Sequence, residues 1–189
     1  MRIDRLRENY HIVIRWTAFP LHPETSEQGQ TLEELFQGRS SDLKAAMLRI
    51  KQAADQVGLP MAERTKTYNS RLAQELAKWA ESMGRGDQYH QAVFKAYYVG
   101  GSNIGNVDEL VSITESIGLS GREARSVLEN RMCREPVDSD WKRSRKLGIT
   151  GVPTFAMGRR SIVGAQPYEV LEDLIKAGGA MRRNIEEHT

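Results

Sequence analysis

Thiol chemistry is limited in this sequence, because its 189 residues include one cysteine, Cys133. An exchange that passes through an intramolecular disulfide needs two thiols, so Cys133 cannot carry out this reaction alone. Arg131 and Arg134 lie close to it in the sequence and would favour its thiolate form. Charges spaced in this way along a helix more commonly form a solvated face, and we therefore interpret Cys133 as a structural residue.

The histidines and the loops offer no second reaction centre. His11 and His22 flank an expected strand and loop, whereas His90 lies in an expected helix and His188 in the tail. None of them has another ligand at a spacing typical of metal sites. The sequence also has no glycine-rich phosphate loop and no nucleophile elbow. We expect no metal in the protein and assign no catalytic residue.

A proline lies directly before an expected strand in the run formed by Thr150, Gly151, Val152, Pro153 and Thr154. Proline is tolerated at the first residue of a strand, where its missing N–H costs little. A cis bond before it would instead turn the chain sharply and leave the preceding N–H and C=O groups free. Such groups can pair with an extended peptide as if a strand were added. The run therefore predicts either a rigid turn or a peptide-binding edge.

The elements around this run alternate between strand-like and helical patterns. The β-branched and aromatic residues of 11–19 predict the best strand of the chain, and apolar runs between Thr154 and Gly164 predict a hairpin. Capping residues and apolar spacing predict helices between these two regions. In order, we expect the end of a helix over 3–9, a strand over 11–19, a long series of helices, the hairpin, and a helix from Pro167 to Gly178.

Particular residues are expected at the ends and inner faces of these helices. Thr31 and Glu34 fit a capping box. Asn69 or Ser70 is expected to open one helix, and Asp108 is expected to cap another. The side chains expected to point inward are Leu72, Leu76, Trp79 and Met83 in one helix, and Val93, Phe94 and Tyr97 in the next.

Taken together, these stretches resemble the DsbA-like branch of the thioredoxin superfamily. The segment "LGITGVPTF", the hairpin, "IVGAQP" and the terminal helix carry the resemblance, which is closest to the FrnE-type subgroup that includes 2-hydroxychromene-2-carboxylate isomerases. "IVIRWTAFPLHP" is similar to the second strand and following loop of that subgroup. "TYNSRLAQELAKWA" and "VFKAYYVGGSNIGNVDELVSIT" are similar to the start and middle of its helical insertion. The resemblance covers nearly the whole chain in order.

The resemblance implies an α/β fold with a thioredoxin-like, DsbA-type sheet, a large inserted helical domain, and the first strand missing. Residues 1–39 and 147–189 would form the N-terminally truncated thioredoxin-like domain, and residues 40–146 the insertion. A cis Val152–Pro153 bond would lie beside the site. The substrate-binding residues would be Thr150, Gly151, Val152, Pro153 and Thr154, together with Asn69. In isomerase and kappa-class glutathione transferase relatives, the residue similar to Asn69 lies near bound thiol or substrate; its other interpretation is a helix cap.

Members of this family normally begin with a strand and a Cys-x-x-Cys or a serine-containing variant, and this sequence has neither. Its first residues, "MRIDRLRENY", resemble the end of the helix that follows that motif. Without the strand, the segment His11–Trp16 would lose ladder partners along one edge, at a cost of about 1–3 kcal/mol per buried group. A start upstream of Met1, a strand from a second chain, or a different closure of the sheet would each solve this problem. We favour the upstream start, because the other motifs are kept.

The leading hypothesis for function is a DsbA-family thiol–disulfide oxidoreductase-like protein that is inactive in this form, because the catalytic cysteine pair is absent. The alternatives are a glutathione-dependent isomerase or transferase of the same superfamily, and a non-catalytic protein that binds peptides or thiol compounds. Whether the chain is an enzyme is therefore open. The expected partner is a peptide or small molecule with a thiol or disulfide. No cofactor is expected, although glutathione is left open, as is a homodimer.

The composition argues against some other partners. The 27 basic and 25 acidic residues give a net charge of +2, which provides no electrostatic reason to expect nucleic acid or a membrane surface. No apolar run is long enough to span a bilayer, and the first residues lack the pattern of a secretory signal. A single cysteine does not demand an oxidising compartment, so the expected location is the cytoplasm.

Overall fold

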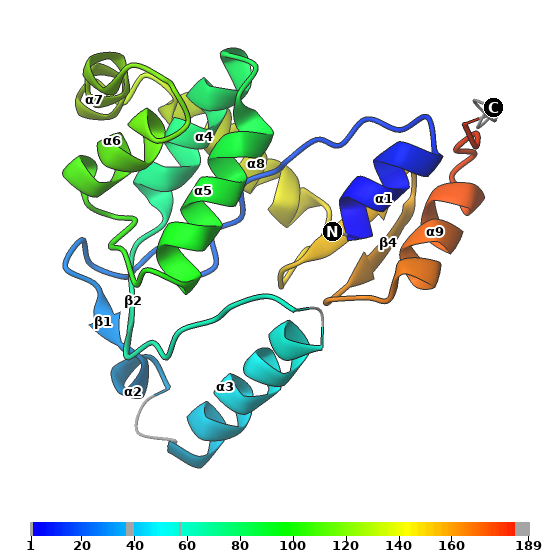
Figure 1. Ribbon diagram of the computed structural model, residues 1–189, viewed down its shortest axis with the longest axis horizontal. Coiled ribbons are helices and arrows are strands. Elements are labelled where there is room, and N and C mark those ends of the chain that lie inside the picture. The colour runs from blue at the N-terminus through cyan, green and yellow to red at the C-terminus, as the bar shows by residue number, and fades with distance from the viewer. Residues whose placement is uncertain (1, 37–39, 57, 184–189) are drawn as a thin grey trace. The chain divides into compact units, whose positions relative to one another are not determined.

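The computed structural model describes residues 2–36, 40–56 and 58–183 (Figure 1). By packing, the chain forms two units. The hairpin unit contains Met1–Leu21 and Asp140–Thr189, and the helical unit contains His22–Ser139. These units are defined by contacts alone, so the division into 1–39 with 147–189, and 40–146, stays a prediction.

The hairpin unit places helices on a short antiparallel hairpin. Strand β3 (Thr154–Met157) pairs with β4 (Arg160–Val163), so that Thr154 lies opposite Val163. Helix α1 (Arg2–Asn9) and helix α9 (Tyr168–Ala177) contribute buried side chains to one cluster, against which the hairpin packs through Phe155 and Ile162. The buried members of this cluster are Leu6, Tyr10, Tyr168, Leu171 and Ile175.

The predicted first helix, hairpin and final helix are confirmed, with one shift. Pro167 is the N-cap of α9 and not its first helical residue, since its φ of −57° and ψ of 158° are extended. The helix ends with Gly178 as its C-cap. Helix α8 precedes the hairpin and runs over Arg134–Lys146.

The predicted strand over 11–19 is wrong, because this segment makes no strand pairing. One isolated bridge joins Tyr10 to Arg182, and His11 N–H donates to the carbonyl of Met181. Further along, Ala18 N–H donates to the Asp140 carboxylate at 2.9 Å. The β-branched side chains favour an extended backbone, but a ladder also needs a neighbouring strand, and none lies beside this segment among the described residues. Val13 is 95% exposed as a result.

In the described part of the helical unit, four helices pack around an apolar core. They are α4 (Arg71–Ser82), α5 (Gly86–Tyr98), α6 (Val107–Glu115) and α7 (Gly121–Glu129). Fully buried core residues include Leu76, Ala80, Leu110 and Ala124. The unit also contains the helices α2 (Leu32–Leu35) and α3 (Ser40–Asp55), and strand β1 (Gln30–Thr31), which pairs antiparallel with β2 (Lys66–Thr67).

The observed helix caps agree only in part with those predicted from the sequence. Thr31 and Glu34 form the predicted capping box at α2. The predicted cap at Asp108 is wrong, because Asn106 takes this position and its side chain accepts the N–H groups of Asp108 and Glu109. A residue with an extended backbone and a short polar side chain can reach back to the second and third amides of the helix. Asn106 meets this requirement, whereas Asp108 is already helical.

Two side chains that were predicted to point inward are instead exposed. Met83 is 49% exposed because it lies just past the end of α4 as its C-cap. Phe94 is 50% exposed because the inner face of α5 is formed around Tyr89, which is almost fully buried. Leu76 is buried as expected, and Leu72, Trp79, Val93 and Tyr97 are partly buried against the same core.

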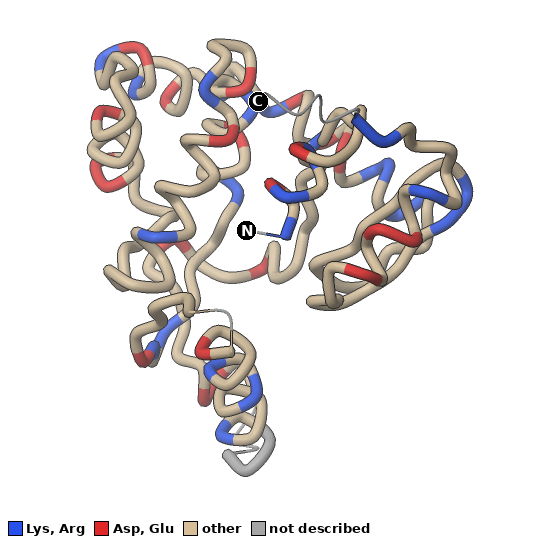
Figure 2. Tube along the Cα trace, turned by 45° about the vertical axis from the view of Figure 1, so that its right-hand side comes forward, with Lys and Arg blue, Asp and Glu red and all other residues tan. Residues whose placement is uncertain are grey.

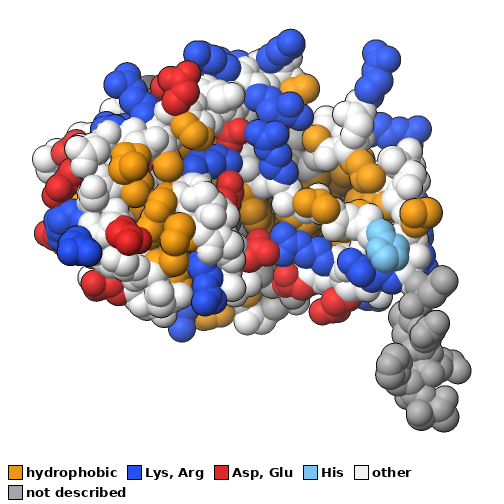
Figure 3. Space-filling model, turned by 90° about the horizontal axis from the view of Figure 1, so that it is seen from above, with side chains coloured by type: hydrophobic (Ala, Val, Ile, Leu, Met, Phe, Trp, Pro, Cys, Tyr) orange, Lys and Arg blue, Asp and Glu red, His pale blue; other side chains and the backbone are white. Residues whose placement is uncertain are grey.

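Both signs of charge are distributed along the trace, with basic and acidic residues interspersed on the helices (Figure 2). Apolar side chains reach the surface between them (Figure 3). Within the described ranges, no helix is long and apolar enough to cross a membrane.

Candidate functional site

The run from Thr150 to Thr154 forms a loop that leads into β3. Its Val152–Pro153 peptide bond is cis, as the resemblance implied. Val152 is 50% exposed, and Thr150 and Pro153 are also exposed. The loop therefore presents an apolar side chain to solvent at the point where the strand begins.

Hydrogen bonds hold this loop from one side. The Thr154 hydroxyl donates to the carbonyl of Gly151 at 2.7 Å, and Gly164 N–H donates to the carbonyl of Pro153 at 2.8 Å. Across the described part of the chain, the N–H and C=O groups of Val152 make no hydrogen bond. Strand β3 pairs with β4 and with no other described strand. The loop thus carries free backbone donors and acceptors beside an exposed valine.

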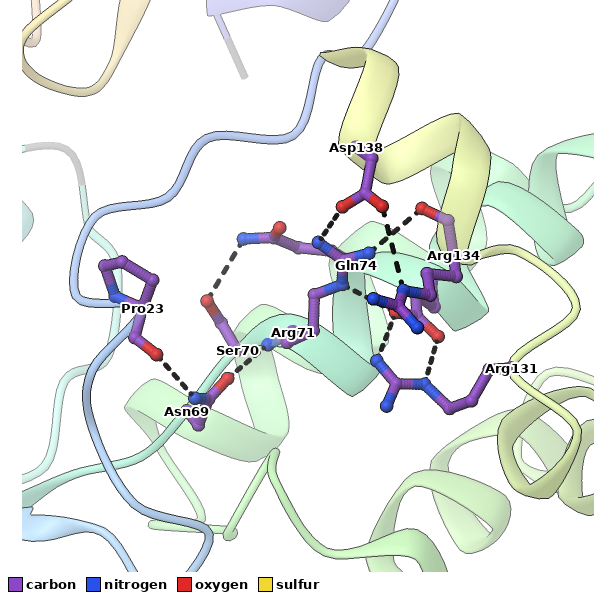
Figure 4. Close-up of polar contacts among 9 residues, drawn as sticks. Pro23, Asn69, Ser70, Arg71, Gln74, Arg131, Arg134 and Asp138 are labelled. Carbon is purple, nitrogen blue, oxygen red and sulfur yellow. Dashed lines mark hydrogen bonds and ion pairs between the residues drawn. The ribbon is translucent and has the colours of Figure 1, made fainter. Parts of the chain in front are cut away.

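Asn69 belongs to the helical unit, where it holds a loop in place (Figure 4). Its side-chain amide donates to the carbonyls of Pro23 and Thr25, at 3.2 and 2.7 Å. Its side-chain oxygen accepts the N–H of Arg71 at 2.9 Å, at the start of α4. Both amide hydrogens of Asn69 are thereby used by the backbone. Ser70 is the N-cap residue, but its side chain makes no capping hydrogen bond.

A buried ion cluster lies on the next turn of α4, and the sequence patterns did not single it out (Figure 4). Glu75 is fully buried, and its carboxylate accepts hydrogen bonds from Arg71 at 2.6 Å and from Arg131 at 2.7 and 2.8 Å. Arg71 also pairs with Asp138 at 2.7 Å and donates to the carbonyl of Arg134 at 2.9 Å. The Arg71–Glu75 spacing of four residues was the available signal, but the partner from 131 was not predictable from it.

Cys133 lies beside this cluster, and its thiol is not activated. Burial raises the pKa of the thiol, the negative charge of Glu75 raises it further, and Lys78 lowers it. Arg131, which could favour the thiolate, is paired with Glu75. The balance of these effects keeps the Cys133 thiol protonated to a higher pH than an ordinary cysteine, which makes it a poor nucleophile at neutral pH.

Among the described residues, no three side chains of His, Cys, Asp or Glu lie close enough together to bind a metal ion.

Glu81 accepts a hydrogen bond from Lys78 at 3.2 Å and lies 3.6 Å from His90. Burial raises the pKa of Glu81, but the neighbouring His90 and Lys78 together lower it.

A model of the DSBA-like thioredoxin domain matches residues 1–176 of the sequence. The chain belongs to this family. The resemblance stated from the motifs is therefore confirmed, and so is the DsbA-type thioredoxin-like fold with its large helical content. The sequence departs from a dithiol member of this DsbA-like family because it holds one cysteine and no Cys-x-x-Cys pair.

Individual relatives agree with this assignment. The uncharacterized protein YwbO of Bacillus subtilis (strain 168) is 28% identical over 167 residues, which cover 87% of this chain and 81% of YwbO. A "probable DsbA oxidoreductase" from Streptomyces coelicolor has a similar structure, with a TM-score of 0.78, 24% identity, and coverage of 86% of this chain and 74% of its own. A 2-hydroxychromene-2-carboxylate isomerase gives a TM-score of 0.72 at 19% identity, with coverage of 94% and 85%. At these identities the two solved structures show the fold alone.

Proposed function

We propose that this DsbA-like chain binds extended peptides that carry a thiol or disulfide, through residues 150–154, and does not itself exchange disulfides. The observation that carries the proposal is the exposed Val152, whose backbone N–H and C=O groups have no partner among the described residues. A peptide in an extended conformation can pair with such groups as an added strand. Thr150, Gly151, Pro153 and Thr154 shape the same edge.

The lack of exchange follows from the thiols of the chain. A two-thiol relay needs a second cysteine, and the sequence has Cys133 alone. The raised pKa of this thiol further disfavours attack on a disulfide at neutral pH. We expect this chain to leave the rate of insulin reduction by dithiothreitol unchanged.

Peptide binding is tested by titration with a short, acetylated and amidated peptide. The probe has a central cysteine with a free thiol between valines, lysines at its ends and no acidic residue. We expect Val152→Asp to weaken binding by about tenfold, because the peptide's apolar side chain would meet a charge. The matched control is Val170→Asp in the first turn of α9, where a negative charge is favourable and the fold is kept. Equal affinity of the two variants would contradict the proposal.

A second candidate function is a glutathione-dependent isomerase or transferase, in which Asn69 would contact the bound thiol compound. Its support is the fold shared with the isomerase structure. Asn69 would have to give up a hydrogen bond to Pro23 or Thr25 to donate to a ligand. Calorimetry with glutathione distinguishes the two functions: measurable affinity in the wild type that disappears in a folded Asn69→Ala variant would favour the second.

A further inference from the structure

Arg64 lies outside the loop at 150–154 and has no acidic partner among the residues that the structure describes. The central carbon of its guanidinium lies 4.5 Å from the ring centroid of Tyr97 and 4.8 Å from that of Tyr98. The two rings meet edge to face at 4.9 Å and so form a corner around the cation. Throughout the described ranges, Arg64 makes no hydrogen bond and no ion pair, and its Nε atom is buried without an acceptor.

A guanidinium in this position lacks acceptors for part of its hydrogen-bonding capacity. The two rings stabilise its flat face through cation–π attraction, which leaves the N–H groups in its plane without acceptors. Buried polar groups in folded proteins almost always have a hydrogen-bond partner, so an unpartnered Nε–H needs an explanation. The paired N–H groups of an arginine match the two oxygens of a carboxylate. Because the Nε atom is buried, a carboxylate that another molecule supplies would pair with the terminal Nη groups of Arg64.

An aromatic row continues from this corner along α5. Phe94 stacks on Tyr98 with ring centroids 6.1 Å apart, and on His90 at 6.5 Å. Residues four positions apart face the same side of a helix. Phe94 is 50% exposed, so part of the row is accessible from solvent. This arrangement suits an apolar or aromatic side chain that stacks on it.

The length of the row favours a peptide over a single small ring. His90 and Tyr98 are eight positions apart, which corresponds to about 12 Å along a helix. An extended peptide covers this length with about four residues. The acidic end of such a peptide is directed to Arg64, because at the other end of the row His90 already lies 3.6 Å from the Glu81 carboxylate.

We propose that Arg64 and the row of His90, Phe94 and Tyr98 bind an extended acidic peptide in which a carboxylate side chain lies next to an aromatic one. The carboxylate accepts hydrogen bonds from the Nη groups of Arg64, and the aromatic side chain packs against Phe94. The binding is non-covalent and uses no residue of 150–154. It therefore goes beyond the function proposed above and does not depend on it.

The test uses two short peptides and the full chain. The first is acetylated and amidated and reads serine, glutamate, phenylalanine, glutamate, serine; the second has glutamine in place of each glutamate. We expect the first to bind about tenfold more tightly in a calorimetric or NMR titration, because a charge-assisted pair is lost in the second. Arg64→Gln is expected to remove this difference, and Phe94→Leu to weaken both peptides.

A matched variant controls for net charge. Arg122→Gln removes an exposed arginine from α7 and changes the charge of the chain equally, so we expect it to leave the affinities unchanged. Equal affinity of the wild type for the two peptides would overturn the proposal, and this comparison requires no variant to fold. Equal losses in the two arginine variants would also overturn it. A loss caused by Val152→Asp would place the peptide at 150–154, which contradicts this inference and leaves the proposed function standing.

Discussion

The side chains of Glu75 and Arg131, 56 residues apart in the sequence, meet in a two-pronged hydrogen bond inside the helical unit. Arg131 donates its Nε–H to one carboxylate oxygen at 2.8 Å and an Nη2 hydrogen to the other at 2.7 Å. Glu75 is fully buried and also accepts the Nε–H of Arg71. The pair ties α4 to the turn that precedes α8.

Removal of the Glu75 carboxylate is expected to destabilise the fold. In Glu75→Gln, Arg71 and Arg131 lose their shared counter-charge, and breaking a buried pair in this way typically costs about 3–5 kcal/mol. We expect a value near the lower end, because the Arg131 side chain is 44% exposed and can be hydrated. Urea unfolding measures the loss. The control is Glu129→Gln, which changes an exposed residue of α7. For this variant we expect the free energy of unfolding to change by no more than about 0.5 kcal/mol. Similar losses in both variants would contradict the account.

The Glu75 carboxylate also makes the stability of the fold depend on pH. Burial raises the pKa of Glu75, but hydrogen bonds and charges from Arg131 and Arg71 together lower it below its ordinary value. A carboxyl group with a lower pKa in the folded state stabilises the fold above its unfolded pKa, and this contribution is lost as the pH falls through the folded pKa. We therefore expect the free energy of unfolding to decrease below about pH 5. A decrease of the same slope in Glu75→Gln would show that other groups cause it.

The Cys133 thiol is expected to react slowly. Burial and Glu75 raise its pKa, so a smaller fraction is thiolate at neutral pH than for an ordinary cysteine. Alkylation of the folded chain by iodoacetamide should be clearly slower than alkylation of the same chain in urea. If the folded chain reacted faster, Cys133 would be an activated thiol, and the proposed lack of exchange would lose its second argument.

Asn69 is expected to contribute to stability through the loop that it holds. Asn69→Ala leaves the carbonyls of Pro23 and Thr25 and the N–H of Arg71 without this partner. We expect a loss of about 1–3 kcal/mol in thermal or urea unfolding. Asn130→Ala provides the comparison, because among the described residues that exposed side chain bonds only to Ser126, four positions earlier. No difference between the two variants would mean that the hydrogen bonds of Asn69 are replaced by water.

Local patterns predicted the elements whose signals lie close together in the sequence. The capping box at Thr31 and Glu34, the hairpin after Pro153 and the terminal helix up to Gly178 depend on neighbouring residues, and each is confirmed. The predicted cap at Asp108 lies two residues too far along the chain, because Asn106 offers the same chemistry two positions earlier. Such errors are small, since competing polar residues lie next to one another at a helix start.

Long-range pairing could not be predicted in the same way. The segment 11–19 has the composition of a strand, yet a strand also requires a neighbour, which its own residues do not encode. Glu75 shows a spacing of four to Arg71, but nothing in the sequence points to Arg131. The aromatic corner around Arg64 was missed for the same reason, because its residues come from 64 and from α5. The residues expected to bind substrate, Thr150 to Thr154 and Asn69, remain predictions.

The central claim, that residues 150–154 bind an extended peptide, is tested most directly by NMR. The backbone amide signals of the chain would be followed while the same cysteine-containing peptide is added. We predict that the signals of Gly151, Val152 and Thr154 shift most, and that the Val152 amide becomes protected from exchange with water. Shifts that leave these three residues unchanged while the peptide binds elsewhere would contradict the account.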